Sequence, residues 1–182
     1  DDNGLALVAV VRVRQNYNNA FYRGDTNWLY FGDGKPYAGI LDIVAHEYTH
    51  GVTRHTANLI YKDQSGALNE AFSDIFGESV EAYGHGAADW IHSAELGAGR
   101  RRLDNPASVE IIPGQPYTYP AAMSEYYGPN SPFLNNFTNR DNGGVHINMT
   151  IVAHAYYLLA EGLSGAIGIR DAERIFYRAL AH

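Results

Sequence analysis

The chain has 182 residues, enough for one domain with a sizeable core or for two small lobes that share a cleft. Hydrophobic residues make up 46% of it and charged residues 18%, as in folded globular proteins rather than disordered ones. Its formal net charge of -7 disfavours general binding to nucleic acid or to an anionic membrane surface. The chain contains no cysteine, which excludes disulfide bonds, thiolate zinc sites and cysteine nucleophiles.

The first forty residues have a strand-like pattern. The longest apolar run, 5–11, is rich in β-branched residues and far shorter than the ~20 residues that a membrane span needs, so it predicts a buried strand. A polar cluster at 15–19 indicates a turn. The segment 28–31 predicts a second short strand, which a Gly-Asp-Gly sequence then ends.

Apolar residues take up helical spacing after Pro36. The spacing predicts four helices, over 40–57, 67–83, 147–161 and 171–180. A loop at 63–66 is expected to lead into the second helix, because it contains Asp, Gln, Ser and Gly. The stretch 84–144 shows no sustained period, and loops of such length are usually functional or organised by ions. The architecture is therefore expected to be α+β, with strands first and helices second.

The strongest functional signal is an H-E-x-x-H motif at 46–50, on the first predicted helix. Histidines at positions i and i+4 project from one face of a helix, so His46 and His50 can bind one tetrahedral zinc ion. Glu47 lies beside them, in position to contact a water on the metal rather than the metal itself. The alternative interpretation of these five residues alone is a pair of surface histidines on an amphipathic helix.

A catalytic zinc site needs a third protein ligand and an open fourth position. The next predicted helix supplies Glu70, with nineteen residues between His50 and Glu70. An antiparallel pair of helices joined by a loop of that size can bring Glu70 to the same metal. Asp74, one turn further on, is expected to accept a hydrogen bond from a zinc-binding histidine and to fix its tautomer. Without the upstream motif, a solvated helix face would be the expectation for both carboxylates.

H-E-x-x-H followed at this distance by N-E-A-x-S-D resembles the thermolysin family of neutral zinc metalloendopeptidases. Other segments are similar to that family in the same order along the chain: Asn18-Asn19-Ala20-Phe21, Asn58-Leu59-Ile60-Tyr61, Asp89-Trp90, Arg101 ahead of Asn105-Pro106, Asp141-Asn142-Gly143-Gly144-Val145-His146-Ile147-Asn148 and Ile175-Phe176-Tyr177-Arg178-Ala179-Leu180. The resemblance extends from about residue 15 to residue 180, and it is weakest between 91 and 137.

This resemblance implies a thermolysin-like zincin fold of the α+β class. Residues 1–57 would form a β-rich part that ends in the zinc-binding helix, and 58–182 a mainly helical part with long loops. The resemblance also implies a zinc cofactor, a peptide or protein substrate, secretion, and a precursor with a propeptide. It gives no reason to expect nucleic acid or a membrane as a partner.

The resemblance assigns catalytic roles that the chemistry of the side chains supports. Glu47 is expected to act as the general base that takes a proton from zinc-bound water and passes it to the leaving amine. Tyr61 and His146 match the residues that stabilise the oxyanion of the tetrahedral intermediate, and Asp141 matches the carboxylate that orients that histidine. Asn69 matches a hydrogen-bond partner of the other zinc histidine.

Substrate and calcium sites are implied in the same way. Arg101 and the backbone of Asn19 and Ala20 match groups that hold the main chain of the substrate. Ile43 fits a pocket that selects a hydrophobic residue after the scissile bond. The family binds calcium near the second helix, often as a pair of ions, and one calcium ion is expected here from the matched carboxylates Asp42, Glu81 and Asp89.

Two other functions remain open. A zinc aminopeptidase also uses H-E-x-x-H and a downstream glutamate, but with one residue fewer before that glutamate and with a G-x-M-E-N segment that this chain lacks. A non-catalytic, zinc-stabilised binding module would have no reason to keep the matched catalytic residues together. The histidines outside the matched positions are expected on the surface or on helix faces: His55, His85, His92, His154 and His182.

The two ends of the chain predict exposed apolar surface. The strand at 5–11 has no neighbour of comparable strength within the first forty residues, and a lone strand is marginal in water. The last helix stops without a capping glycine, and thermolysin-like domains continue on both sides of the matched region. We therefore expect a partial catalytic domain, in which apolar side chains of the first strand or last helix are exposed or covered by another copy.

Overall fold

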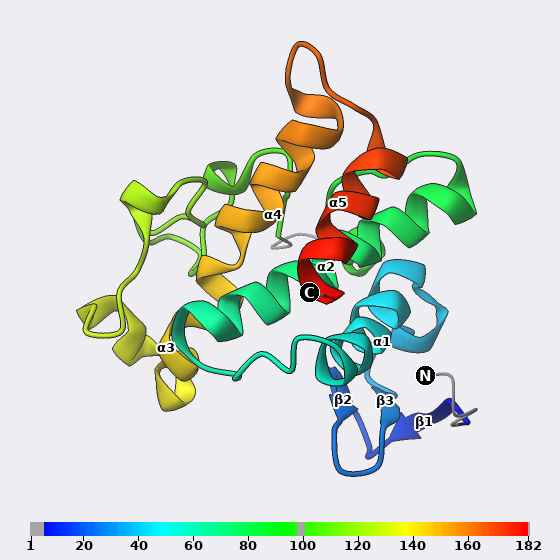
Figure 1. The fold of residues 1–182 in the computed structure, drawn as a ribbon. Coiled ribbons are helices and arrows are strands. Elements are labelled where there is room, and N and C mark those ends of the chain that lie inside the picture. The colour runs from blue at the N-terminus through cyan, green and yellow to red at the C-terminus, as the bar shows by residue number, and fades with distance from the viewer. Residues whose placement is uncertain (1–5, 98–100, 182) are drawn as a thin grey trace.

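The computed structural model describes residues 6–97 and 101–181. A small β-sheet precedes a larger helical part (Figure 1), as the expected α+β class requires. The sheet has the strand order β1-β3-β2, in which β1 runs parallel and β2 antiparallel to the central strand. Its strands are β1 (Val8–Val13), β2 (Ala20–Arg23) and β3 (Trp28–Gly32).

The strand predictions are confirmed in part. The segment 28–31 is β3, whereas the strand expected at 5–11 begins only at Val8, and Leu5 lies outside the described residues. The strand β1 does have a strong neighbour, since it pairs with β3 from Val8 opposite Trp28 onwards. The strand β2 was not expected, because four residues are too few to show a clear alternation.

The sheet packs one face against helix α1 (Leu41–His55). Alternate side chains of β3, Leu29 and Phe31, are each 1% exposed, as the two-residue period of a half-buried strand requires. They form a core cluster with Ala20 of β2 and with Ile40 and Ile43 at the start of α1. This cluster holds the first part of α1 against the sheet.

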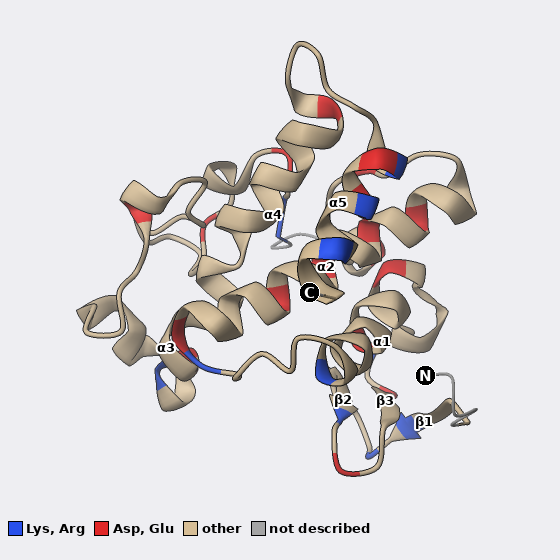
Figure 2. Ribbon diagram, viewed as in Figure 1, with Lys and Arg blue, Asp and Glu red and all other residues tan. Residues whose placement is uncertain are grey.

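Helix α1 packs against helix α2 (Asp63–His85), and the helix predicted over 40–57 is confirmed. Helix α2 begins four residues before the prediction, so the loop expected at 63–66 is wrong. Gly66 is buried within α2, where a Cβ atom would lie 2.5 Å from Val145 Cγ1. This glycine therefore marks a close approach of two elements rather than a turn. Acidic residues recur along α2 (Figure 2), and Glu70, Asp74, Glu78 and Glu81 among them are buried.

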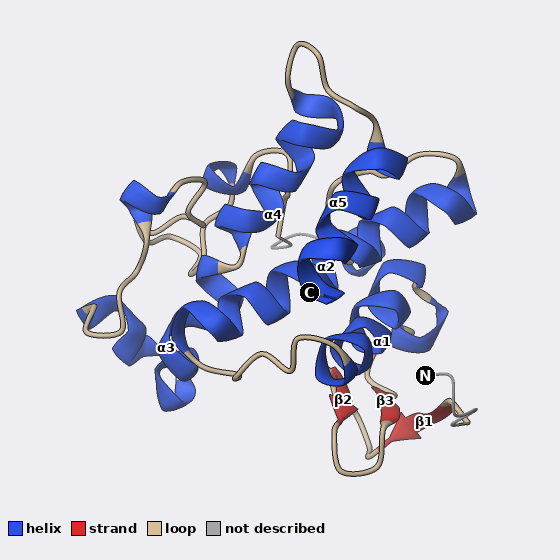
Figure 3. Cartoon of the chain, viewed as in Figure 1, coloured by secondary structure: helices blue, strands red, loops and turns tan. Residues whose placement is uncertain are grey.

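The C-terminal part is helical (Figure 3). Helices α3 (Asp141–Asn148), α4 (Thr150–Tyr157) and the π-helix η7 (Leu158–Gly162) occupy the region of the helix predicted over 147–161, and α5 (Ile169–Ala181) confirms the last one. Side chains of α2, α4 and α5 form the main core, whose buried members are Ala67, Ala71, Ile75, Trp90, Leu103, Met149, Ala153, Tyr156, Ala160 and Ala172.

The described residues between α2 and α3 form short turns of 3₁₀ helix and two isolated β-bridges, as the lack of a sustained period predicts. A third core cluster around Phe133, Leu134 and Ile147 holds it against α3. In the described part of the chain, no helix combines the length and apolar character that crossing a membrane demands. The 3₁₀ turns of the chain are η1 (Tyr37–Gly39), η2 (Ala94–Leu96), η3 (Pro106–Ser108), η4 (Met123–Glu125), η5 (Pro132–Asn136) and η6 (Thr138–Arg140).

Apolar side chains are exposed near both ends, as expected. Val11 of β1 is 54% exposed, and Leu7 just before it is 59% exposed. On α5, Ile175 and Tyr177 are about half exposed.

Candidate active site

Three side chains expected to bind zinc converge between α1 and α2. His46 and His50 project from neighbouring turns of α1, and their Nε2 atoms lie 3.1 Å apart. Glu70 of α2 faces both rings, with its Oε2 3.4 Å from His46 Nε2 and its Oε1 3.5 Å from His50 Nε2. Ligand atoms about 2.1 Å from a tetrahedral metal lie roughly 3.4 Å from one another, so these distances fit one zinc ion.

The electrostatics of the three residues also favour a cation. Glu70 is 1% exposed, and its Oε2 atom has no hydrogen-bond partner among the described residues. Burial alone would raise the pKa of Glu70, but the imidazoles of His146, His50 and His46 hold that pKa well below its usual range. Burial also disfavours a charged His46, yet the Asp74 and Glu70 carboxylates raise the pKa of His46 to about 10. A divalent ion in place of that proton suits this environment.

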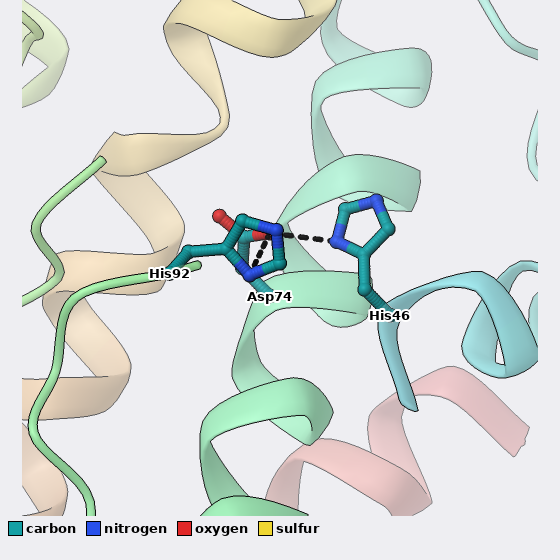
Figure 4. A group of neighbouring side chains, drawn as sticks. All are labelled: His46, Asp74 and His92. Atoms are coloured by element: carbon teal, nitrogen blue, oxygen red, sulfur yellow. Dashed lines mark hydrogen bonds and ion pairs between the residues drawn. The ribbon is translucent and has the colours of Figure 1, made fainter. Parts of the chain in front are cut away.

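Hydrogen bonds orient both imidazole rings. His46 Nδ1 donates to Asp74 Oδ1 at 2.7 Å (Figure 4), and His50 Nδ1 donates to Asn69 Oδ1 at 2.7 Å. These bonds place the protons on Nδ1 and leave each Nε2 lone pair for a metal. Asp74 is fully buried, and it accepts two hydrogen bonds of 2.8 Å from Arg101. Although burial would raise the pKa of Asp74, Arg101 and the neighbouring histidines hold it well below its usual range.

Glu47 lines an open cleft of about 640 Å³ beside the converging histidines. Its side chain is 7% exposed, and burial raises its pKa, although the charges of His46 and His50 oppose that shift. A carboxylate with a raised pKa is better matched to proton transfer near neutral pH. The residues expected to bind substrate also line the cleft: Asn19, Ala20, Ile43 and Arg101.

Tyr61 and His146 line the same cleft and both approach Glu70 Oε1. The Tyr61 hydroxyl donates a hydrogen bond to Glu70 Oε1 and lies 3.0 Å from His146 Nε2. Burial and the Glu70 carboxylate both raise the pKa of Tyr61, so its hydroxyl stays protonated as a donor. His146 Nδ1 lies 2.6 Å from Asp141 Oδ1. Burial would lower the pKa of His146, but the Glu70 and Asp141 carboxylates outweigh it and raise that pKa.

A left-handed stretch of backbone holds Asp141 against His146. Six consecutive residues, Asn139 to Gly144, have φ angles between 49° and 91°. Glycine adopts positive φ without strain. Neither glycine has room for a side chain, because a Cβ would lie 2.0 Å from Asp63 Oδ1 at Gly143 and 2.8 Å from a side-chain atom at Gly144. Left-handed residues cost ~1–2 kcal/mol each where they are not glycine, and such strain concentrates at functional sites. Right-handed helical backbone therefore begins only after Gly144, near the predicted helix start at 147.

His92 is buried in the site, so its predicted surface position is wrong. Its side chain is 7% exposed, and its ring centroid lies 4.9 Å from that of His46. His92 Nδ1 lies 3.4 Å from Asp74 Oδ1, the oxygen that also accepts the bond from His46 (Figure 4). The loop that carries it is held by a bond from His92 N to Arg101 O. An irregular loop gives no periodicity from which this burial could be predicted.

The expected calcium ligands divide between two groups of side chains. Glu81 and Asp89 lie with Glu78, and their ligand atoms are within 4.8 Å of one another. Asp42 is grouped with Glu78 and His92, and Glu78 belongs to both groups, so the expectation that Asp42, Glu81 and Asp89 bind calcium stays a prediction. Glu78 was missed in the sequence, although its spacing of four from Asp74 and three from Glu81 places all three on one face of α2.

These features are those of the H-E-x-x-H class of metalloproteins. Residues 57–182 match the family model described as the thermolysin metallopeptidase alpha-helical domain, and residues 1–54 match the thermolysin metallopeptidase catalytic domain. The chain belongs to the thermolysin family of metallopeptidases.

Relatives of known name agree with this membership. The chain is 40% identical to an extracellular metalloprotease of Pectobacterium carotovorum subsp. carotovorum, over 99% of this chain and 53% of the relative. It is 39% identical to a bacillolysin of Brevibacillus brevis and 37% identical to a thermolysin of Alicyclobacillus acidocaldarius subsp. acidocaldarius, over 100% of this chain and 33% of each relative. It therefore spans between a third and about half of the length of these relatives.

A solved structure supports the fold. The precursor of protealysin, a metalloproteinase from Serratia proteamaculans, matches with a TM-score of 0.78 and 33% identity. The match covers 100% of this chain and 58% of that one. The thermolysin-like α+β fold expected from the sequence is confirmed.

Proposed function

We propose that this chain carries the catalytic centre of a zinc endopeptidase, with His46, His50 and Glu70 as the metal ligands. The observation that supports it is the convergence of these three donors at one end of a cleft that Glu47 also lines. Zinc in such a site supplies a Lewis acid that polarises a carbonyl and lowers the pKa of water. Three protein ligands leave a fourth position for substrate or water, as catalytic zinc sites require.

Glu47 is the proposed general base. Its carboxylate takes a proton from the attacking water and gives that proton to the nitrogen of the leaving amine. The burial that raises its pKa makes both transfers easier near neutral pH, because the group can hold the proton between the two steps. Glu47 follows His46 directly on α1, so the helix itself fixes its distance from the ligands.

Tyr61 and His146 are the proposed donors to the oxyanion of the tetrahedral intermediate. The Tyr61 hydroxyl keeps its proton, and the raised pKa of His146 increases the fraction of the ring that is charged. Asp141 orients that ring through its Nδ1 atom. In other enzymes, removal of a donor aimed at developing negative charge lowers kcat by ~10²–10³-fold.

The cleft supports an extended peptide substrate. We infer that the backbone of Asn19 and Ala20 and the guanidinium of Arg101 hold the substrate main chain, and that Ile43 favours a hydrophobic side chain after the scissile bond. All four residues line the cleft, and Ile43 is 5% exposed. Arg101 also donates two hydrogen bonds to Asp74, the carboxylate that orients His46. The proposed substrate-binding guanidinium is therefore linked to a zinc ligand.

Calcium, secretion and a propeptide belong to the same proposal. The oxygen ligands of Glu78, Glu81 and Asp89 suit calcium, and both oxygens of Glu78 lack a hydrogen-bond partner in the described residues. Relatives named as an extracellular metalloprotease and as a precursor of protealysin support secretion from a propeptide-containing precursor.

Digestion of casein and of a peptide blocked at both ends tests the proposed activity. We expect both to be cleaved internally, with activity lost in a zinc chelator and restored by added zinc. An amino-acid anilide with a free amine serves as the comparison substrate. Cleavage of the anilide but not of the blocked peptide would identify an aminopeptidase instead. Full zinc occupancy without cleavage of any of the three would indicate a non-catalytic zinc module.

A further inference from the structure

One cation of the active-site cleft has no part in the proposed mechanism. Of the described lysines and arginines, Arg54 and Arg101 line this cleft. Arg101 donates two hydrogen bonds to Asp74, so a buried carboxylate matches its charge. Arg54 is exposed, and no carboxylate in the described part of the chain forms an ion pair with it. Its charge is therefore available to a ligand in the cleft.

Arg54 lies on the same side of α1 as the histidines of the zinc site. We call His46, His50 and Glu70 the catalytic set. Arg54 follows His50 by four residues, as His50 follows His46, so the three side chains leave successive turns of one helix face. At a rise of about 1.5 Å per residue, Arg54 lies ~9 Å along the helix from the midpoint of the two histidines.

The order of residues along α1 gives the direction of a bound peptide. In the proposed function, on which this inference rests, Ile43 contacts the residue that follows the scissile bond. Ile43 precedes His46 by three residues and Arg54 follows His50 by four, so the catalytic set lies between Ile43 and Arg54. A peptide with its reacting carbonyl at the metal must then extend toward Arg54 with the residues that precede the bond. An extended chain rises about 3.3 Å per residue, so Arg54 faces the second or third of them.

The end of β2 holds the guanidinium at the edge of the cleft. A Cβ atom at Gly24, just after β2, would lie 2.8 Å from Arg54 Nη1, so the missing side chain leaves room for the guanidinium. Tyr22 of β2 also lines the cleft, and the Arg54 charge opposes the rise that burial causes in the pKa of Tyr22. Within the described sheet β2 is an edge strand, so its free edge can align an extended peptide that passes Arg54.

We propose that Arg54 selects substrates with an acidic side chain at the second or third residue before the scissile bond. A carboxylate can accept two parallel hydrogen bonds from a guanidinium. The carboxylates among the described residues that line the cleft are Glu47 and Glu70, which lie at the metal site rather than beside Arg54. The expected substrate class is thus a peptide with Asp or Glu shortly before a hydrophobic residue.

A role at the helix end is the alternative for Arg54. It lies in the last turn of α1, where a positive charge stabilises the unpaired carbonyl groups of the helix. That role requires only a charge near the helix end, and it predicts no preference among substrates. Selectivity therefore separates the two roles.

A set of peptides blocked at both ends measures this selectivity. Each has one hydrophobic residue after the scissile bond and has Glu, Gln or Lys at the second residue before it or, in a parallel series, at the third. We expect kcat/KM to be about 5-fold higher for Glu than for Gln in at least one series, as for a well-formed exposed ion pair, and to be lowest for Lys. The ratio of Glu to Gln should decrease at about 0.5 M salt, because salt screens exposed charges.

Substitutions assign the preference to Arg54. Arg54→Gln is expected to bring the ratio of Glu to Gln close to one, and Arg54→Glu to reverse the preference, so that the Lys peptide is cleaved faster than the Glu peptide. Arg178→Gln removes an exposed charge of α5 outside the cleft, and it should keep the native ratio.

Two results would overturn the proposal and leave the endopeptidase function intact. One is a ratio close to one in both series for the native sequence, which needs no variant. The other is a native ratio that persists in Arg54→Gln. A zinc-loaded chain that cleaves none of the peptides would instead refute the proposed function, and the selectivity with it.

Discussion

Helix α2 carries two pairs of buried carboxylates whose electrostatic surroundings are opposite. Glu70 and Asp74 have pKa values well below their usual range, whereas those of Glu78 and Glu81 are raised. All four side chains are at most 6% exposed, so accessibility to water does not explain the difference. The cause is the identity of their neighbours.

The first pair has cations supplied by the chain itself. Glu70 faces three imidazoles, and Asp74 accepts two bonds from Arg101. The second pair faces mainly other carboxylates, which raise its pKa values further. The comparison teaches that the chain itself supplies partners of opposite charge for Glu70 and Asp74, whereas no described lysine or arginine forms an ion pair with Glu78 or Glu81.

The largest expected effect comes from the Glu70→Ala variant. Removal of one of three ligands leaves two imidazoles, so we expect zinc to be lost on dialysis. Metal catalysis contributes several kcal/mol, so kcat/KM should fall by about 10³-fold or more. Metal analysis of the purified variant is the measurement, with Glu173→Ala, on α5, as a control. Full zinc occupancy with normal activity would exclude Glu70 as a ligand.

A smaller loss is expected for His146→Ala. The proposed role is a contact made mainly in the transition state, so kcat should fall by ~10²–10³-fold with little change in KM. Steady-state kinetics on a blocked peptide separates the two constants. His55→Ala, an exposed histidine of α1, provides the control. A rise in KM alone would show that His146 binds the ground state and would remove the oxyanion role.

Asp74→Asn is expected to weaken zinc binding by ~10–100-fold, as substitutions of residues that orient metal ligands generally do. The neutral amide accepts the His46 bond poorly and leaves Arg101 buried without its partner charge. Competition with a chromophoric chelator measures the zinc affinity. An unchanged affinity would mean that Asp74 does not orient His46 in the metal-bound state.

The smallest effect is expected on stability when calcium and transition metals are removed. A cation at about 100 times its Kd adds about 2.7 kcal/mol, so a chelator should lower Tm by several degrees. The pKa of Glu78 in the folded chain, about 10, lies above the ordinary glutamate value of 4.5. The folded chain therefore binds the extra proton between these values, and the metal-free chain should lose stability as the pH rises from 5 to 8.

Thermal melts across that pH range, with and without chelator, check this prediction. The variant Glu78→Gln keeps the shape of the side chain without its charge, so it should melt higher than the native sequence in chelator. Glu70→Gln should melt lower in the same buffer, because it removes a charge that the imidazoles stabilise. Equal shifts for the two variants would contradict the difference between the two pairs.

Periodicity in the sequence predicted the long helices well, because α1 and α5 each bury one continuous face. It was less informative where packing at one residue decides the backbone. Gly66 has the signature of a loop, but it lies within α2, where glycine is required because Val145 leaves no room for a side chain. The strand β2 and the left-handed stretch from Asn139 to Gly144 depend on tertiary contacts that have no period.

The candidate site shows the same limit. The spacing of His46, His50 and Glu70 follows from helix geometry, so their convergence could be expected from the sequence. His92 and Glu78 were missed for different reasons. His92 reaches the site on an irregular loop, and nothing local signals that. Glu78 does lie at helical spacing from Glu81, but a further glutamate on an acidic face is ordinarily solvated.

The central claim is that three side chains hold the metal while Glu47 moves the proton. Measuring zinc content and peptide cleavage together in Glu47→Gln tests it most directly. The account predicts one zinc per chain at the catalytic set, as in the native sequence, and a fall in kcat of ~10²–10⁴-fold, the range that general acid–base groups contribute. Loss of zinc together with activity would make Glu47 a ligand, and retention of both would remove it from the reaction.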